Sequence, residues 1–173
     1  NGRVTGCTFN SPFVQDGGVS LGAIDIEPWS EYSQISIDNC LFIGSTKISC
    51  GSAPNSVSQI IRGLTLSNLT FDLRGSTAAH TADDLIGIAG AWSNPGFGLT
   101  TVRRFEGLTI ENIAVYSDKA LGGDIIQLTN CVIGNGSIIR GIRNLSTARG
   151  ASAILFSGAW LEGTVIIEEN DFG

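Results

Sequence analysis

A recurring hexad constrains the fold of this chain more than any other feature of its sequence. The clear copies have apolar residues at positions one and six, a small or apolar residue at position four, and asparagine or glycine at position three. Because asparagine and glycine tolerate the left-handed backbone region, position three predicts a bend between two short strands. The clearest copies begin at Val4, Ile37, Leu66, Ile110 and Leu128, and weaker ones at Ile142 and Ile167.

The bend predicts how the copies stack. If one turn of the chain separates them, equivalent positions lie about 4.8 Å apart, the spacing of paired strands. Position four then points inward, which predicts that Cys7, Cys40 and Cys131 share one position as packed thiols. The asparagines at position three are expected to bond their neighbours above and below as a ladder. They are Asn39, Asn68, Asn112, Asn130 and Asn144.

Short isoleucine-rich segments lie between the hexads and read as buried parallel strands. They begin at Ala23, Leu85, Asp124 and Ala153. Regular strands at irregular intervals, with loops at 51–58 and 90–100, are typical of a solenoid. We therefore predict an all-β, single-domain parallel β-helix over residues 1–173, with about 6–8 coils. The main alternative, a β-sandwich, should show hairpin turns, for which Asn135-Gly136 is the nearest candidate.

Charge narrows the range of partners. The chain has 10 Lys and Arg against 16 Asp and Glu, for a net charge of −6. This acidity disfavours nucleic acid and anionic membranes. No apolar run reaches the roughly 18 residues of a membrane span, and the first residues do not form a signal peptide. With one histidine and no paired cysteine spacing, we expect no metal site and no cofactor.

The stretch 24–27, Ile-Asp-Ile-Glu, carries the first candidate site. In a strand its isoleucines share one face, and Asp25 and Glu27 project from the other, with backbones about 6.5–7 Å apart. That spacing lies within reach of both glycosidase geometries, so these two are the first catalytic candidates. Trp29 and Tyr32 follow closely and could stack on sugar rings. The alternative is a solvated strand face that ends at the following proline.

If the isoleucine-rich strands are aligned with one another, further polar residues join the candidate site of Asp25 and Glu27. Asp84 and Asp124 each precede such a strand and are expected to stack at one edge as additional catalytic candidates. Gln127 would then occupy the position of Asp25 on its own coil. Together these side chains would line an acidic groove suited to hydroxyl-rich sugars.

Four more residues are candidate substrate contacts. His80 lies beside two aspartates, as a general base does, although it could equally be an exposed loop residue. Arg103 and Arg104 could clamp a substrate carboxylate, which a lyase acting on uronates requires. Trp92 is either an exposed sugar platform or a residue packed in the core or at an interface. A calcium-assisted lyase has no calcium-binding loop signature to support it.

The Ile-x-Asn-Cys-x-Phe hexads, together with Gly-Ala-Ile-Asp-Ile-Glu-Pro at 22–28, resemble the right-handed β-helix superfamily of pectate lyases. The closest resemblance is to bacteriophage tailspikes and related polysaccharide-degrading appendages. It implies a homotrimer of side-by-side helices that binds or cleaves a cell-surface polysaccharide, either on a virion tail or outside the cell. Because the chain is short and starts and stops on a strand, we expect a fragment of a longer protein or ends covered by partners.

Two functions remain open at this point. The first is a polysaccharide depolymerase, more a glycosidase than a lyase, with Asp25 and Glu27 as acid and base or nucleophile. The second is a non-catalytic structural or adhesive β-helix of a viral or secreted fibre. The feature that divides them is whether the carboxylates of Asp25, Glu27, Asp84 and Asp124 converge on one groove.

Overall fold

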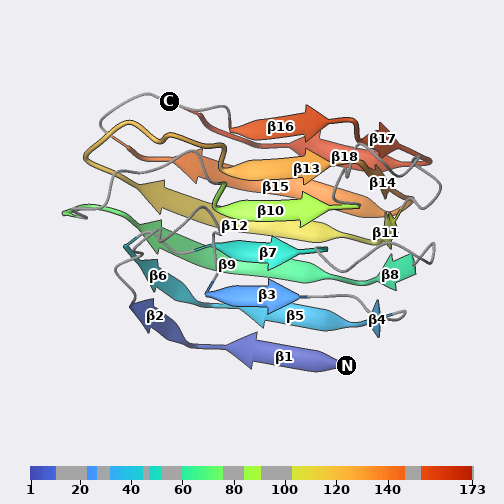
Figure 1. Cartoon of the computed structure of the whole chain (residues 1–173), viewed down its shortest axis with the longest axis horizontal. Helices are drawn as coiled ribbons and strands as arrows, with labels where there is room; N and C mark the ends of the chain where they lie inside the picture. The colour runs from blue at the N-terminus through green and yellow to red at the C-terminus, as the bar shows by residue number, and fades with distance from the viewer. Residues whose placement is uncertain are drawn as a thin grey trace, which may run out of the picture.

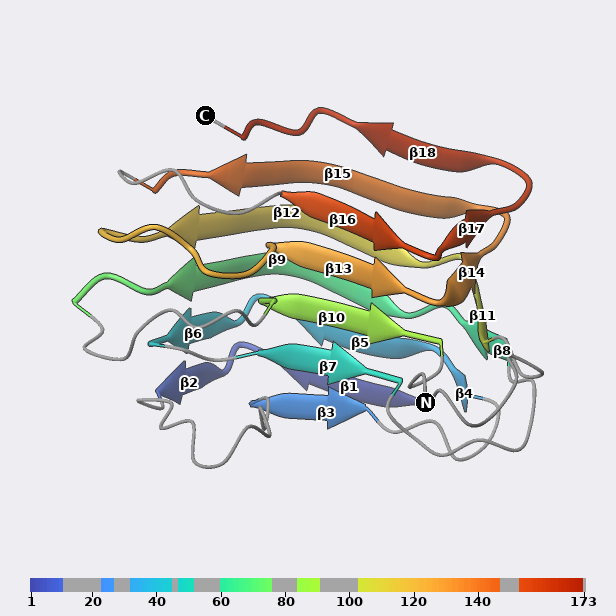
Figure 2. The ribbon, with the colours of Figure 1, turned by 45° about the horizontal axis from the view of Figure 1, so that its top comes forward.

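The chain is all-β and its strands stack in parallel (Figures 1 and 2). The computed structural model describes residues 1–10, 23–26, 32–44, 47–51, 60–75, 84–90, 103–146 and 153–172. Every pairing between described strands is parallel, which excludes the antiparallel sandwich for this part of the chain. The prediction of stacked parallel strands is confirmed.

Sheet A has eight strands. Six follow one another in the order β1 (Gly2–Thr5), β5 (Ile35–Asp38), β9 (Thr65–Asp72), β12 (Thr109–Tyr116), β15 (Ser137–Asn144) and β18 (Val165–Glu168). Two short strands continue this sheet past a bend: β2 (Thr8–Asn10) pairs with β6 (Leu41–Ile43), and β6 pairs with β9.

Sheets B and C have five strands each. Sheet B is formed by β3 (Ile24–Ile26), β7 (Ile48–Cys50), β10 (Ile86–Ala89), β13 (Ile126–Thr129) and β16 (Ile154–Ser157). Sheet C is formed by β4 (Tyr32–Ser33), β8 (Ile60–Arg62), β11 (Arg103–Glu106), β14 (Cys131–Ile133) and β17 (Trp160–Leu161).

The chain visits the sheets in a fixed order. Each pass runs from sheet B through sheet C to sheet A, as in β10, β11 and β12, and the next pass lies on top of the previous one (Figure 2). This arrangement fits a parallel β-helix. At one end lies the N-terminal edge, formed by β1, β3 and β4, and at the other lies the C-terminal edge, formed by β16, β17 and β18 (Figure 1).

The predicted bends are present in sheet A. Asn39, Asn68 and Asn112 have φ values of 52°, 54° and 56°, and Gly6 has 65°. Their backbones adopt the left-handed conformation, which asparagine and glycine accept at a lower steric cost than other residues. The sequence therefore encodes the bend locally. In the last strand Glu169 takes the same conformation, with φ of 55°, at a higher steric cost.

Two of the predicted hexads are corrected by the strand register. Arg140 pairs with Glu111, which places Gly141, with φ of 65°, at the bend where Asn144 was expected. The copy thus begins at Ile139 rather than Ile142. A strand rich in isoleucine and arginine satisfies the hexad in two registers, and only its pairing partner distinguishes them.

The hexad that begins at Leu128 belongs to a different bend. Asn130 has φ of 47°, but it joins β13 of sheet B to β14 of sheet C. Cys131 therefore does not share the position of Cys7 and Cys40, and its register partner is Arg103 instead. The hexad indicates a left-handed residue at position three, with inward-facing residues at positions one and four. This pattern suits any bend of the coil.

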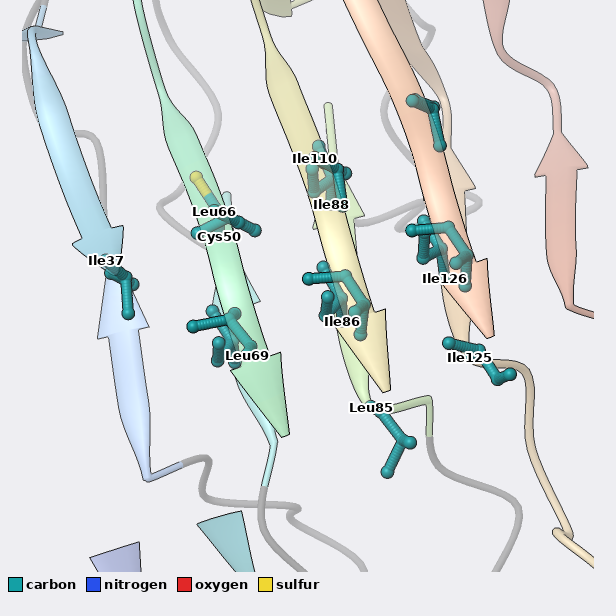
Figure 3. Close-up of a cluster of buried hydrophobic side chains, with 14 of the residues drawn as sticks. Ile37, Cys50, Leu66, Leu69, Leu85, Ile86, Ile88, Ile110, Ile125 and Ile126 are labelled. Atoms are coloured by element: carbon teal, nitrogen blue, oxygen red, sulfur yellow. The ribbon is translucent and has the colours of Figure 1, made fainter. Parts of the chain in front are cut away.

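The core is a single column of stacked aliphatic and aromatic side chains. Figure 3 shows part of its aliphatic lines, together with Cys50. In sheet A, Ile37, Leu66 and Ile110 lie in register and are fully buried. Phe9, Phe42 and Phe71 form a second line, with neighbouring ring centroids 4.9 Å and 4.7 Å apart. Each fully buried side chain of this size contributes about 1.5–3 kcal/mol of burial free energy, so the stacked lines hold the sheets together.

The four cysteines are free thiols. Burial raises the pKa of Cys50 to about 12, and burial also raises the pKa of Cys131 to about 12. At such values the thiols stay protonated at neutral pH, and Cys40 is likewise buried, its Sγ donating to the carbonyl oxygen of Asp38 at 3.3 Å. Cys40, Cys50 and Cys131 are therefore packing residues, although of these only Cys40 lies at the hexad position that was predicted for it.

Candidate functional site

The outer face of sheet B carries a line of polar and small residues that we name the sheet B strip. Its members are Asp25, Ser49, Gly87, Gln127 and Leu155, which lie in register on successive strands. They alternate with buried isoleucines, so their side chains face outward. Gln127 occupies the position of Asp25 on its own strand, as the sequence pattern indicated.

Contacts along the strip join neighbouring strands. The Ser49 hydroxyl donates to Oδ1 of the exposed Asp25 at 2.8 Å. At Gly87 the strip has no side chain, and a Cβ there would lie 3.2 Å from Cε of Lys47. The glycine thus leaves room for the lysine stem beside the strip. A carboxylate, a hydroxyl, an amide and an ammonium group gather on this face.

Asp84 and Asp124 stack at the starting edge of sheet B. The Asp124 amide donates to Oδ1 of Asp84 at 3.2 Å, and the Leu85 amide donates to the Asp124 carbonyl at 3.1 Å. Asp84 is buried, with 6% of its surface exposed. The Asp84 carboxylate thus links the start of β10 to the start of β13. This structural role explains why an aspartate stands at position 84.

The candidate acids lie at two separate places. Asp84 is two strand spacings from the Asp25 strand and three residues before the strip, which separates their backbones by roughly 14 Å. The register therefore places Asp25 on the strip and Asp84 with Asp124 at its border. Glu27, the partner proposed for Asp25, lies outside the described residues.

The two adjacent arginines face opposite sides of sheet C. Arg103 is buried, and burial lowers the pKa of its guanidinium. Arg104 faces outward and contacts Oε2 of Glu162 at 2.7 Å through Nη1, which raises the pKa of its guanidinium. Successive strand residues point to opposite faces, so these two do not form a joint clamp.

Four candidate residues lie outside the described part of the chain: Glu27, Trp29, His80 and Trp92. Tyr32 is placed through its backbone, which forms β4 and pairs with Ile61. Their proposed contacts with substrate stay predictions.

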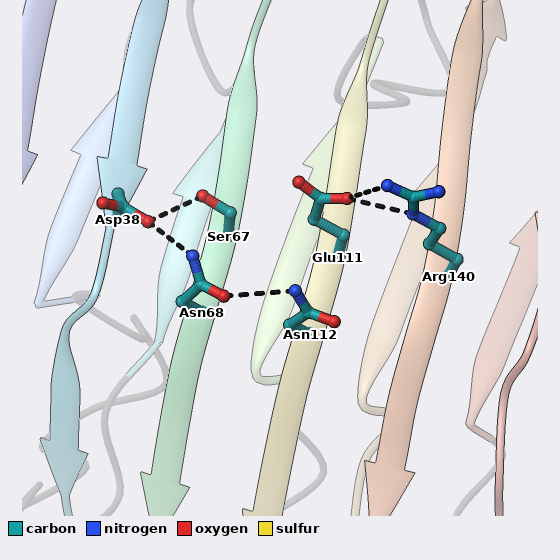
Figure 4. Close-up of polar contacts among 6 residues, drawn as sticks. All are labelled: Asp38, Ser67, Asn68, Glu111, Asn112 and Arg140. Atoms are coloured by element: carbon teal, nitrogen blue, oxygen red, sulfur yellow. Dashed lines mark hydrogen bonds and ion pairs between the residues drawn. The ribbon is translucent and has the colours of Figure 1, made fainter.

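A polar cluster at the bend of sheet A was not predicted as a unit (Figure 4). Asp38 accepts hydrogen bonds from Ser67 at 2.9 Å and from Asn68 Nδ2 at 2.8 Å, and these bonds hold the pKa of its carboxyl below the usual range. Asn112 Nδ2 donates to Asn68 Oδ1 at 3.1 Å, so part of the expected ladder is present. In the sequence, a polar residue precedes each hexad asparagine, and this pattern could have predicted the cluster.

The next two strands of this face are joined by an ion pair. Glu111 of β12 accepts two hydrogen bonds from Arg140 of β15, at 3.0 Å from Nε and 2.8 Å from Nη2 (Figure 4). With the Asp38 cluster it forms a band across the outer face of sheet A in which each charge has a partner. This face stabilises the stacking and offers a ligand few unpaired groups.

Within the described ranges no three His, Cys, Asp or Glu side chains come together as a metal site would require. The same residues include no helix long and apolar enough to cross a membrane. Comparison of the chain with family models, with curated proteins and with solved structures found no match.

Proposed function

We propose that this chain is a right-handed parallel β-helix domain of about 6–8 coils that binds a bacterial surface polysaccharide along the sheet B strip. The observation that carries the proposal is the strip itself, where Asp25, Ser49 and Gln127 face outward in register. The domain is tailspike-like, acts as a homotrimer, and functions on a virion tail or outside the cell.

The chemistry of the strip suits sugar hydroxyls, which both donate and accept hydrogen bonds. The Asp25 carboxylate accepts, the Gln127 amide does both, and hydroxyls such as that of Ser49 can do either. At Gly87 the Lys47 side chain lies against the strip, with its Nζ 3.7 Å from where a Cβ would stand, so its ammonium group can donate to a sugar hydroxyl. Because the strands repeat at about 4.8 Å, an extended polymer lying across them would meet a polar strip side chain on three of the five strands, at Asp25, Ser49 and Gln127.

Cleavage of the bound polysaccharide is the second part of the proposal. Asp25 is exposed on the strip. Glu27 follows two residues later in the sequence, and if it projects from the same face its carboxylate would lie within reach of both glycosidase geometries. Hydrolysis is favoured over elimination because the two arginines that were expected to clamp a substrate carboxylate do not lie on the strip. Arg104 contacts Glu162, and Arg103 is buried.

One observation favours the alternative of a non-catalytic structural or adhesive fibre. Asp25 is bonded to Ser49, whereas Asp84 and Asp124 lie at the border of the sheet. Among the described residues, then, the carboxylates do not gather around one point. In this alternative the strip binds polysaccharide without cutting it.

Binding is tested by calorimetry with purified capsular or O-antigen polysaccharides of candidate hosts. We expect Asp25→Asn and Gln127→Ala each to weaken binding by roughly five- to hundredfold, the effect of losing one hydrogen bond to a ligand. The matched control is Thr109→Ala, an outward residue of sheet A, which should bind like the wild type. Equal affinity of all four proteins would refute the strip as the binding site.

Cleavage is tested by counting reducing ends released from a polysaccharide that binds. Asp25→Asn and Glu27→Gln should each abolish the release of reducing ends while the fraction of folded protein stays unchanged. If both variants release as many ends as the wild type, the catalytic assignment fails. If no protein releases any, the fibre alternative holds. Light scattering tests the trimer, for which a clean monomer mass would be the contrary result.

A further inference from the structure

The sheet B strip carries an ammonium group that no described carboxylate neutralises. The chain has two lysines, Lys47 and Lys119. Lys47 lies directly before β7 and two residues before Ser49, so its side chain leaves the same outer face of sheet B. It is half-buried, because its stem lies against the neighbouring strand β10. A Cβ on Gly87 would lie 3.2 Å from Cε of Lys47 and 3.7 Å from its Nζ.

Gly87 determines where this ammonium group lies. At every other step of the strip the strand presents a side chain, whereas at Gly87 it presents none. Strand β10 pairs with β7, and the two lie side by side in Figure 2. The lysine stem therefore occupies the step of Gly87. This step lies in register between Ser49 on one side and Gln127 on the other, in the middle of the sheet.

Lys47 differs from five arginines of the chain in having no carboxylate partner within the described ranges. Two aspartates of sheet B are engaged by other groups, since Asp25 accepts from the Ser49 hydroxyl and Asp84 from a backbone amide. A charge without a counterion on a binding face attracts an anionic group of the ligand. The five arginines, by contrast, each contact a carboxylate at 2.7–3.8 Å: Arg3, Arg62, Arg74, Arg104 and Arg140.

The groups around Gly87 suit a carboxylate. The ammonium of Lys47 has three donor hydrogens, and Gln127, in register with Gly87 on the next strand, adds an amide donor. Hydrogen bonds from an ammonium to a carboxylate are charge-assisted and roughly twice as strong as those between neutral groups. Lys47 would hold the carboxylate as a single point charge, unlike the bidentate clamp expected of the two adjacent arginines.

The negative charge of Asp25 decides which step of the strip an acidic sugar occupies. Strand β3 lies two strand spacings from β10, so a carboxylate at Gly87 is roughly 10 Å from Asp25. That distance is about one Debye length at physiological salt, so the repulsion is largely screened, whereas the contact with Lys47 is direct. An acidic sugar thus favours the Gly87 step, and a neutral sugar favours the Asp25 step.

We propose that the polysaccharide bound by the sheet B strip is acidic, and that Lys47 and Gly87 form the subsite for the carboxylate of one of its sugars. This inference rests on the proposed function, because it requires that the strip binds the polymer. It adds the charge of the substrate and its register, with the carboxylate over β10 and a neutral sugar over Asp25.

The test compares an acidic capsular polysaccharide that the protein binds with the same polysaccharide after its carboxyl groups have been reduced to hydroxymethyl groups. Calorimetry gives the affinity for each form, and the ratio of the two is the preference for the carboxylate. We expect the wild type to bind the native form about tenfold more tightly, the effect of one charge-assisted hydrogen bond.

Substitutions at the subsite should change this preference. Lys47→Met keeps the length of the side chain without its charge, and the ratio should fall to near one, whereas Lys47→Arg should keep most of it. Gly87→Ala should also lower the ratio, because the new Cβ displaces the end of the lysine without meeting backbone. The matched control is Lys119→Met, which alters the exposed lysine in the turn after β12 and should leave the ratio unchanged.

The variants Asp25→Asn and Gln127→Ala separate this inference from the proposed function. If neither weakens binding of either form, the strip is not the binding site and both fail. If they weaken binding but the wild type binds both forms equally, or Lys47→Met keeps the preference, the acidic subsite alone is overturned. A wild type that binds only neutral polysaccharides also overturns it.

Discussion

The middle of the column and its C-terminal edge contain the same kinds of residue at equivalent positions, yet these residues differ in burial. Phe71 and Phe172 lie on one line of sheet A, but Phe71 is fully buried against Phe42 and Phe172 is exposed. Among the described residues, paired strands lie on both sides of Phe71, whereas Phe172 has a neighbouring strand on one side. Stability in such a chain resides in the interfaces between successive passes more than in the residues themselves.

The largest expected effect is a truncation in the middle of the column. Phe71→Ala removes a fully buried ring and should lower the free energy of unfolding by about 3–5 kcal/mol. Phe172→Ala removes the equivalent ring at the edge and should cost less than about 1 kcal/mol. Urea denaturation of both variants measures the two costs. Equal costs would mean that the edge is as well packed as the middle.

A second contrast concerns glycines with and without a neighbour above them. A Cβ on Gly90 would overlap the carbonyl of Asn130 on the next pass, so Gly90→Ala should cost about 1–3 kcal/mol through backbone displacement. Gly6 has φ of 65° but open space around it. Gly6→Ala should cost about 1 kcal/mol from the left-handed conformation alone. Thermal unfolding ranks the two, and the reverse order would contradict the packing at Asn130.

The bend ladder predicts a smaller effect. Asn68→Ala removes the hydrogen bonds to Asp38 and from Asn112 and places alanine at φ of 54°, for a total of about 1–2 kcal/mol. Asn68→Gly keeps the backbone conformation and isolates the loss of the hydrogen bonds. Denaturant unfolding separates the two contributions. If the two variants are equally stable, the conformation of residue 68 contributes nothing measurable.

The smallest effect is the pH dependence of the Asp38 cluster. Hydrogen bonds from Asn68 and Ser67 lower the pKa of Asp38 in the folded chain, so the stability they give is present above the unfolded-state pKa of 3.8. It is lost as the pH falls through the lower folded-state pKa. Asp38→Asn should therefore be less stable than the wild type at neutral pH, and this difference should shrink in acid. A difference that does not change with pH would contradict the assignment.

Much of the fold could be predicted because its rules are local. Asn39, Asn68 and Asn112 indicate bends since each residue itself prefers the left-handed region. The alternation in 24–26 places its isoleucines inward and Asp25 outward, as found. Even the match of Gln127 with Asp25 followed from counting residues within two similar strands.

The candidate site could be predicted only in part. Asp84 and Asp124 were expected in the groove, but the structure uses the Asp84 carboxylate to hold the start of the neighbouring strand. Arg103 and Arg104 read as a pair in the sequence, while strand geometry turns one into the protein and the other outward. Such outcomes depend on residues one or two passes away, as Asp124 is from Asp84 and Glu162 is from Arg104, which local patterns do not encode.

The sequence by itself determined that this protein is made of short parallel strands with left-handed bends and an isoleucine-rich interior. Those properties follow from side-chain size, alternation and backbone preference, which each residue carries with it. The tertiary structure decided which bend Asn130 occupies, where Cys131 packs, and that Gly141 rather than Asn144 lies at the bend of β15. Those depend on register between passes, because pairing with a distant strand fixes each residue's neighbours.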